Sequence, residues 1–250
     1  MSLIDTVDQT TIHLLTHKRY ALYTMLADLA FFVLYGFTMS LLLDPTSAAL
    51  TRFFGGQNET ILGLFSNPFF LEAAGWILLT FFTLYVLFCV LEGTAFLLTH
   101  RITGKTISLS VYLQRFSIAS IPWFLLFIIY EVLAFLRDYT SQTTGSVSAW
   151  TGWILSGYVL VLMYFAGVQY AHIVTHPLSF SAAIKQGIHH APIPVVVLLL
   201  VVGLVMDLVF KVILPSTWWE IALRATLFLL WILSARTLWV IANEQKHIPA

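Results

Sequence analysis

Six long apolar stretches, separated by short polar connectors, run along this chain of 250 residues. Each stretch has the length of roughly 20 residues or more that an α-helix needs to cross a bilayer core of about 30 Å. An open backbone would leave amide groups unpaired in hydrocarbon, so each stretch is predicted to be helical. The connectors contain turn formers such as Asp44-Pro45. The predicted spans are residues 20–43, 69–99, 117–139, 149–175, 191–214 and 217–242.

Three shorter segments are amphipathic and not uniformly apolar. Residues 5–19 form the N-terminal one, and residues 107–116 and 178–190 each precede a predicted span. The last two begin with a Ser-apolar-Ser sequence that can cap a helix, and both continue with apolar residues at helical spacing. We therefore expect each of the three segments to form a short helix in the membrane interface.

The segments before the third and fifth spans share more than their serines. Upstream of them, Ala-Phe-Leu-Leu-Thr-His at residues 95–100 matches Ala-His-Ile-Val-Thr-His at residues 171–176. The match predicts three similar two-helix hairpins. Because each hairpin has an even number of spans, the copies form a parallel repeat about an axis along the membrane normal. The alternative is that interfaces require the same chemistry from unrelated segments.

Composition supports a single all-α integral membrane domain over residues 1–250. Apolar residues make up 59% of the chain and charged residues 10%, and the mean hydropathy is +0.89. These values leave too little polar surface for a water-soluble domain. The formal net charge is zero, so no excess positive field is available to hold nucleic acid. The expected surroundings are the lipid bilayer.

The distribution of basic residues predicts the orientation. Eight Lys and Arg residues lie on the side of the two termini and four lie on the other side. By the positive-inside rule, both termini are predicted to be cytoplasmic in a multi-pass protein of a prokaryotic plasma membrane.

One connection resembles a known family. Residues 92–111, with the sequence EGTAFLLTHRITGKTISLSV, are similar to the join between hairpins in the membrane domain attached to some prokaryotic glycerophosphodiester phosphodiesterases and in related six-span proteins of unknown role. In the two-part proteins, the resemblance implies that hydrolysis belongs to a separate soluble barrel. Residues 1–250 contain no such barrel, so the resemblance carries no catalytic residue to this chain.

Polar side chains inside the spans are the main candidates for a functional site. An ionisable residue near mid-membrane costs roughly 2.5 to 3.5 kcal/mol on insertion scales, so each one needs a partner or a wet cavity. Four polar residues are predicted to lie about 10 Å from the cytoplasmic helix ends. We expect the arginine among them to pair with one of the two acids. The four residues are Asp28, Glu92, Gln169 and Arg236.

A second polar layer is predicted toward the external side, where Arg224 is expected to pair with Asp207 or Glu131. Because each layer has two carboxyl groups for one arginine, one acid can remain protonated. That property would suit a proton-coupled or cation-binding transporter. The alternative is that the polar residues join helices through hydrogen bonds of about 0.6 to 2 kcal/mol each.

Histidines provide the other candidate chemistry. His172 and His176 are four residues apart on one helical face, and His189 and His190 are adjacent. Imidazoles at such spacing can bind iron or zinc. Residues 186–190 also resemble one histidine box of membrane desaturases and hydroxylases, although this chain has no second His-His pair. The alternative is that these histidines contact lipid headgroups at the interface.

Together these patterns predict a membrane protein without intrinsic catalysis and without a cofactor. The expected role is transport of a small solute or a lipid, or service as a membrane subunit for a membrane or cytoplasmic protein partner. The alternative is a metal-dependent membrane oxidoreductase that acts on lipid at the cytoplasmic face and holds iron or zinc through the four histidines.

Overall fold

The computed structural model describes residues 2–55, 68–144, 149–175, 177–189, 192–212 and 218–244. Throughout these residues the only regular secondary structure is helical. The elements are α1 (Leu3–Thr16), α2 (Lys18–Gly55), α4 (Pro68–Leu87), the π-helix η1 (Phe88–Glu92), α5 (Gly93–Ile102), α6 (Leu109–Thr144), α7 (Ala149–Ala171), α8 (Phe180–His189), α9 (Ile193–Val212) and α10 (Trp218–Glu244).

Five helical segments are long and apolar enough to cross a membrane. A sixth crossing is obtained if α8 and residues Ile193–Val205 of α9, which meet at a bend of 92°, are counted as one broken span. The described residues thus confirm an all-helical chain with five or six helices able to span a bilayer. The five segments are Lys18–Ala49, Pro68–Ile102, Leu109–Ala134, Trp150–Ala171 and Leu223–Asn243.

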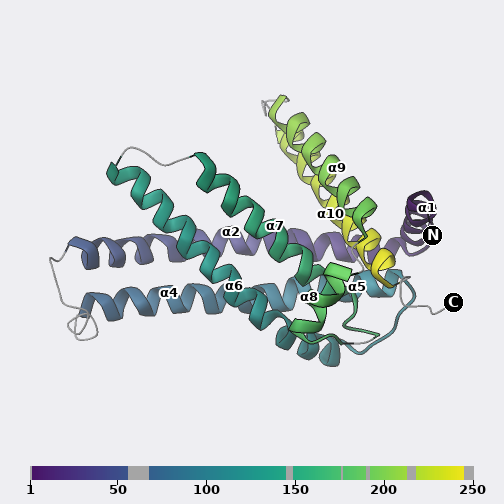
Figure 1. Ribbon diagram of the computed structural model, residues 1–250, viewed down its shortest axis with the longest axis horizontal. Coiled ribbons are helices and arrows are strands. Elements are labelled where there is room, and N and C mark those ends of the chain that lie inside the picture. The colour runs from purple at the N-terminus through teal and green to yellow at the C-terminus, as the bar shows by residue number, and fades with distance from the viewer. Residues whose placement is uncertain are drawn as a thin grey trace.

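The long helices form three side-by-side pairs that diverge from one packed end. α2 packs along α4, α6 along α7, and α9 along α10 (Figure 1). The packed end, which we call the base, consists of α1, η1, α5, α8, the first turns of α6 and the last turns of α7 and α10. Helix α1, near the N-terminus, and the last turns of α10 therefore lie at the same end of the molecule.

Helix α10 is the most enclosed of the long helices. Half of its apolar window is buried, compared with 6% to 17% for the windows of the other four spans. It contacts α1, α2, α5, α7 and α9. A charged side chain on α10 can therefore reach residues of several helices at once.

The base has an aromatic core centred on the fully buried Phe116 of α6. The centroid of its ring lies 4.6 Å from that of Tyr170, 5.6 Å from Phe88, 5.9 Å from Phe96 and 6.1 Å from Tyr112. Tilted and offset ring pairs at these distances are favourable beyond the area that they bury. The Phe116 ring thus joins η1, α5 and α7 to α6.

Two helices run through a proline. α2 continues through Pro45 and beyond its predicted end at residue 43. α6 begins at Leu109 and runs through Pro122, so residues of the predicted interfacial segment 107–116 form the first turns of a long helix. The sequence around residue 117 contains no glycine or proline that would end a helix there. The aromatic core anchors these turns to the base through the buried rings of Tyr112 and Phe116, while Leu109 and Val111 stay exposed.

Helix α1 begins slightly before the predicted start of segment 5–19 because Ser2 caps it. The Ser2 hydroxyl accepts a hydrogen bond from the Asp5 amide at 3.2 Å, and the Asp5 carboxylate accepts one from the Ser2 amide at 2.9 Å. This reciprocal arrangement is a capping box. The hydrogen bond from the Ser2 backbone lowers the pKa of Asp5 below its ordinary value.

Helix α8 occupies most of the predicted interfacial segment 178–190 and packs on α7 through Gly187. The Tyr164 hydroxyl donates a hydrogen bond to the Gly187 carbonyl at 2.7 Å. A Cβ atom at position 187 would lie 2.7 Å from two ring carbons of Phe165 and 3.1 Å from the ring of Tyr164. Glycine therefore permits the close contact between the two helices.

We expect Gly187→Ala to lower the free energy of unfolding by about 1–3 kcal/mol, because the added methyl group overpacks the contact between α7 and α8. The matched control is Gly75→Ala in α4, where nothing lies within 4 Å of an added Cβ. That control is expected to be neutral or to stabilise by up to about 1 kcal/mol through helix propensity. Denaturant titration in detergent, followed by circular dichroism, measures both. Equal effects would contradict the close packing of α8.

Candidate functional site

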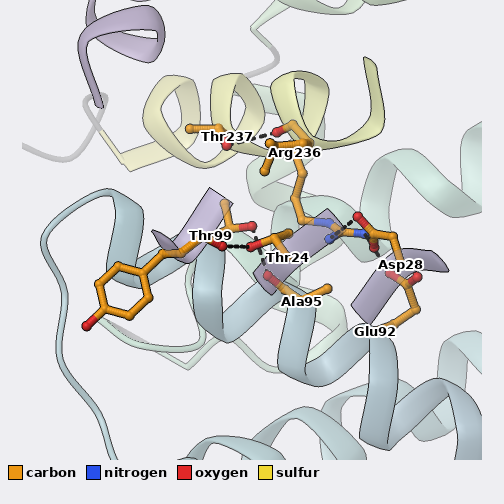
Figure 2. Close-up of polar contacts among 9 residues, drawn as sticks. Thr24, Asp28, Glu92, Ala95, Thr99, Arg236 and Thr237 are labelled. Atoms are coloured by element: carbon orange, nitrogen blue, oxygen red, sulfur yellow. Dashed lines mark hydrogen bonds and ion pairs between the residues drawn. The ribbon is translucent and has the colours of Figure 1, made fainter. Parts of the chain in front are cut away.

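A buried arginine in the base joins two carboxylates from different helices. Nη2 of Arg236, on α10, lies 2.8 Å from Oδ1 of Asp28 on α2 and 2.7 Å from Oε2 of Glu92 on η1. Nη1 of the same arginine lies 3.3 Å from the second carboxylate oxygen of Asp28. Figure 2 shows the three side chains pointing toward one another. We call this set the Arg236 cluster.

The Arg236 cluster is secluded from solvent. The exposed fractions of its side chains are 7% for Arg236, 0% for Asp28 and 11% for Glu92. By contrast, the ion pair between Arg52 and Glu72 is 51% and 35% exposed. An exposed pair of this kind contributes little to stability, whereas removing one partner of a buried pair is strongly destabilising.

Aromatic packing fixes the plane of the arginine. The guanidinium carbon of Arg236 lies 4.7 Å from the centroid of the Phe96 ring. Phe96 is one turn beyond Glu92, so the same helical segment provides both an ion-pair partner and a cation–π partner. The guanidinium therefore uses its N–H groups for the carboxylates and its face for the ring.

Threonines line the cluster without competing for its charges. The buried hydroxyl of Thr24 donates to the Tyr20 carbonyl at 2.8 Å, that of Thr99 to the Ala95 carbonyl at 2.9 Å, and that of Thr237 to the Leu233 carbonyl at 2.8 Å (Figure 2). Each of these bonds is made within the residue's own helix, one turn back. The small side chains let α2, α5 and α10 approach one another around the ion pairs.

Glu92 is the last residue of the π-helical turn η1, which interrupts the helix formed by α4 and α5. Such turns are rare and occur frequently at functional sites. The next residue, Gly93, packs closely on α6, because a Cβ there would lie 2.9 Å from Leu113 and 3.0 Å from Phe116. The adjacent glycine is the only local sequence signal that we find for this contact.

Gln169 lies outside the Arg236 cluster in the structure. Its side-chain oxygen accepts a hydrogen bond from the Trp123 indole, and its amide nitrogen donates to the Leu178 carbonyl at 2.7 Å. Gln169 therefore ties α6 and the segment before α8 to α7. Of the four polar residues predicted at this depth, the structure brings three together, and Gln169 serves a different contact.

The second predicted layer is only partly described. Glu131 is half-buried on α6, and Arg224 is partly buried on α10. Residue 207 belongs to α9, but the side chain of Asp207 lies outside the described residues. The pairing of Arg224 with Asp207 or Glu131 thus stays a prediction.

Among the candidate metal ligands, His172 is buried and its ring nitrogens contact protein groups. Its Nδ1 donates to the Val168 carbonyl at 2.9 Å, so in the neutral ring Nε2 can accept from the Gln186 amide at 2.9 Å. His189 is exposed at the end of α8. Among the described residues, no three His, Cys, Asp or Glu side chains could together hold a metal ion. His176 and His190 lie outside the described residues.

Two further polar side chains of the base were not expected from the sequence. His100 of α5 is fully buried, and its Nε2 donates to the Tyr170 carbonyl at 3.1 Å, which joins α5 to α7. Tyr112 of α6 is also fully buried, and its ring lies 5.8 Å from that of His100. The match between residues 95–100 and 171–176 is the sequence feature that could have indicated the role of His100. The match marks the end of a helix that enters the base.

Comparisons of the chain with protein-family models, with curated proteins and with solved structures find no match. The resemblance to the membrane domain of glycerophosphodiester phosphodiesterases therefore stays a prediction.

Proposed function

We propose that this protein is a carrier that moves a small solute or a lipid across the plasma membrane of a prokaryote, without catalysis and with both termini in the cytoplasm. The Arg236 cluster would be its polar site. The observation that carries the proposal is the burial of two carboxylates around one arginine, between helices that belong to different pairs. Buried ionisable residues in apolar helices are expensive, and they commonly mark substrate or ion pathways.

The arrangement of the helix pairs supports this role. The pairs contact one another at the base, and they diverge away from it (Figure 1). A carrier can expose a fixed site alternately to the two sides when helical units rock against one another. In our proposal the units are three hairpins related by a parallel repeat. Arg236, which joins the last hairpin to the first, would exchange partners during the motion.

The test is flux in liposomes that contain the purified full-length chain. One arm follows a fluorescent phospholipid, whose movement between leaflets is detected by reduction with external dithionite. The other arm follows uptake of radiolabelled amino acids, sugars and organic acids. We expect the protein to increase the rate of phospholipid movement in the first arm or the rate of solute uptake in the second arm. Glu92→Gln should reduce that rate by about tenfold or more, because hydrogen bonds to charged groups contribute about 1.5–3 kcal/mol.

The matched control is Glu72→Gln, which removes a carboxylate from the exposed pair with Arg52. It should leave the rate unchanged. The proposal would be wrong if liposomes with and without the protein gave equal rates in both arms, or if Glu92→Gln and Glu72→Gln behaved alike. Absence of flux would favour the predicted role of a membrane subunit for a partner protein.

A further inference from the structure

The Arg236 cluster has an unbalanced charge. Two carboxylates and one guanidinium have a net charge of −1 when all are ionised, and all three side chains are nearly or fully buried. The guanidinium keeps its proton under all conditions in which proteins are folded. A net charge held away from water is costly, and binding one cation would remove it. The cation has to reach the two carboxylates.

The geometry of the carboxylates favours a very small cation. Oxygens of Asp28 and Glu92 bind the same nitrogen, Nη2 of Arg236, so they are close neighbours. Two carboxyl groups that face each other can share one hydrogen, as paired acids do when like charges lie close together. A larger metal ion in the same place would sit beside the positive guanidinium. A proton does not place a separate positive ion beside the guanidinium, because it becomes part of an O–H bond.

The tyrosine and cysteine side chains around the cluster are neutral near pH 7. Cys89 belongs to η1 itself, and the ring of Tyr170 on α7 packs against those of Phe88 on η1 and Phe96 on α5. The ring of Tyr112 on α6 packs against Phe116 and against His100 of α5, with ring centroids 6.1 Å and 5.8 Å apart. Phenols and thiols ordinarily ionise only well above neutral pH. The phenols and the thiol therefore leave the charge of the cluster unbalanced.

One buried hydroxyl of the base has no hydrogen-bond partner in the described part of the chain. The hydroxyl of Tyr112 is fully buried, and it has no hydrogen-bond partner among the described residues. A buried hydroxyl without a partner loses the hydrogen bonds that it would make with water, which is unfavourable. The Tyr112 ring packs on Phe116, and Phe116 packs on Phe96, the aromatic partner of Arg236, so this hydroxyl belongs to the same packed region as the cluster.

We infer that the Arg236 cluster is a proton-binding site, in which one proton is shared by the carboxyl groups of Asp28 and Glu92 while Arg236 stays charged. Uptake takes a proton from water, forms one O–H bond on a carboxyl oxygen and changes the charge of the cluster from −1 to zero. Release reverses these changes. The use of this proton to couple transport rests on the proposed function, but the binding of the proton does not.

Infrared difference spectroscopy of the purified full-length chain tests the inference. At neutral pH the wild-type protein should show the C=O stretch of a protonated carboxylic acid, and raising the pH should remove it. Asp28→Asn and Glu92→Gln should each abolish the same component of this band, because a single remaining carboxylate is balanced by Arg236 and stays ionised. Glu72→Gln, in the exposed pair, should leave the band unchanged.

Two spectroscopic results would overturn the inference. One is a band that survives both Asp28→Asn and Glu92→Gln, which would assign the proton to another acid. The other is an acid band that disappears at constant pH when sodium chloride replaces choline chloride, which would make the cluster a metal-cation site.

A measurement on the wild-type protein covers the case in which the variants do not fold. Dicyclohexylcarbodiimide modifies protonated carboxyl groups in apolar surroundings, and mass spectrometry of the digested protein locates the adduct. We expect the adduct on Asp28 or Glu92 at neutral pH, and its loss at high pH. No adduct on either residue, together with no acid band, would refute the proton site. An adduct and a band without flux in liposomes would refute only the carrier.

Discussion

Replacing Arg236 with leucine is expected to lower the free energy of unfolding by about 3–5 kcal/mol, because the substitution leaves two buried carboxyl groups without their cation. Arg236 binds Asp28 through both of its terminal nitrogens and binds Glu92 through one. Removing it breaks the link between α10 and the helices α2 and η1. Denaturant titration of the purified protein in detergent, followed by tryptophan fluorescence and circular dichroism, measures the change.

The control for Arg236→Leu is Arg52→Leu, since Arg52 also binds a carboxylate at 2.7 Å but at an exposed position. Its expected cost is about 0–1 kcal/mol, as for other surface ion pairs. Adding Asp28→Asn and Glu92→Gln to Arg236→Leu should recover a large part of the lost stability, because the unpaired acids are then gone. Equal effects of Arg236→Leu and Arg52→Leu would show that the cluster does not join the helices.

The sequence predicted the members of the cluster through two physical limits. Ionisable residues in apolar runs need partners, and the rise of about 1.5 Å per residue places each polar group at a depth. The predicted distances from the helix ends place Asp28, Glu92 and Arg236 at the same depth in the membrane, and the structure pairs them. Depth also placed Gln169 there, but this residue faces Trp123 and Leu178. Depth alone does not give the direction in which a side chain leaves its helix.

Other features of the site depend on contacts between helices that are distant in sequence. Phe96 approaches Arg236 only after α5 and α10 have packed. The π-helical turn that ends at Glu92 has no distinctive residue pattern of its own. The continuation of α2 through Pro45 also overrides a local turn signal, since α2 packs along α4 over this region. In each case the contacts between helices determine the local structure, which the neighbouring residues in the sequence do not determine alone.

The second large effect is expected at the aromatic core. Phe116→Ala should lower the free energy of unfolding by about 3–5 kcal/mol, as large-to-small substitutions of buried aromatic residues do. The ring is fully buried and has four aromatic neighbours, including Tyr170 at a centroid distance of 4.6 Å. Its loss would leave a cavity between η1, α6 and α7. The same denaturant titration measures the change in the free energy of unfolding.

Phe82→Ala is the matched control for Phe116→Ala, because it makes the same chemical change on α4 at a ring that is 66% exposed. In a bilayer or a detergent micelle, that ring would contact acyl chains before and after unfolding, so little stability depends on it. We expect the control to change the free energy of unfolding by less than about 1 kcal/mol. Similar losses for the two variants would mean that the base is not the packed core of the molecule. The helix pairs would then have no common rigid end against which to move, and the rocking motion proposed for the carrier would lose its physical basis.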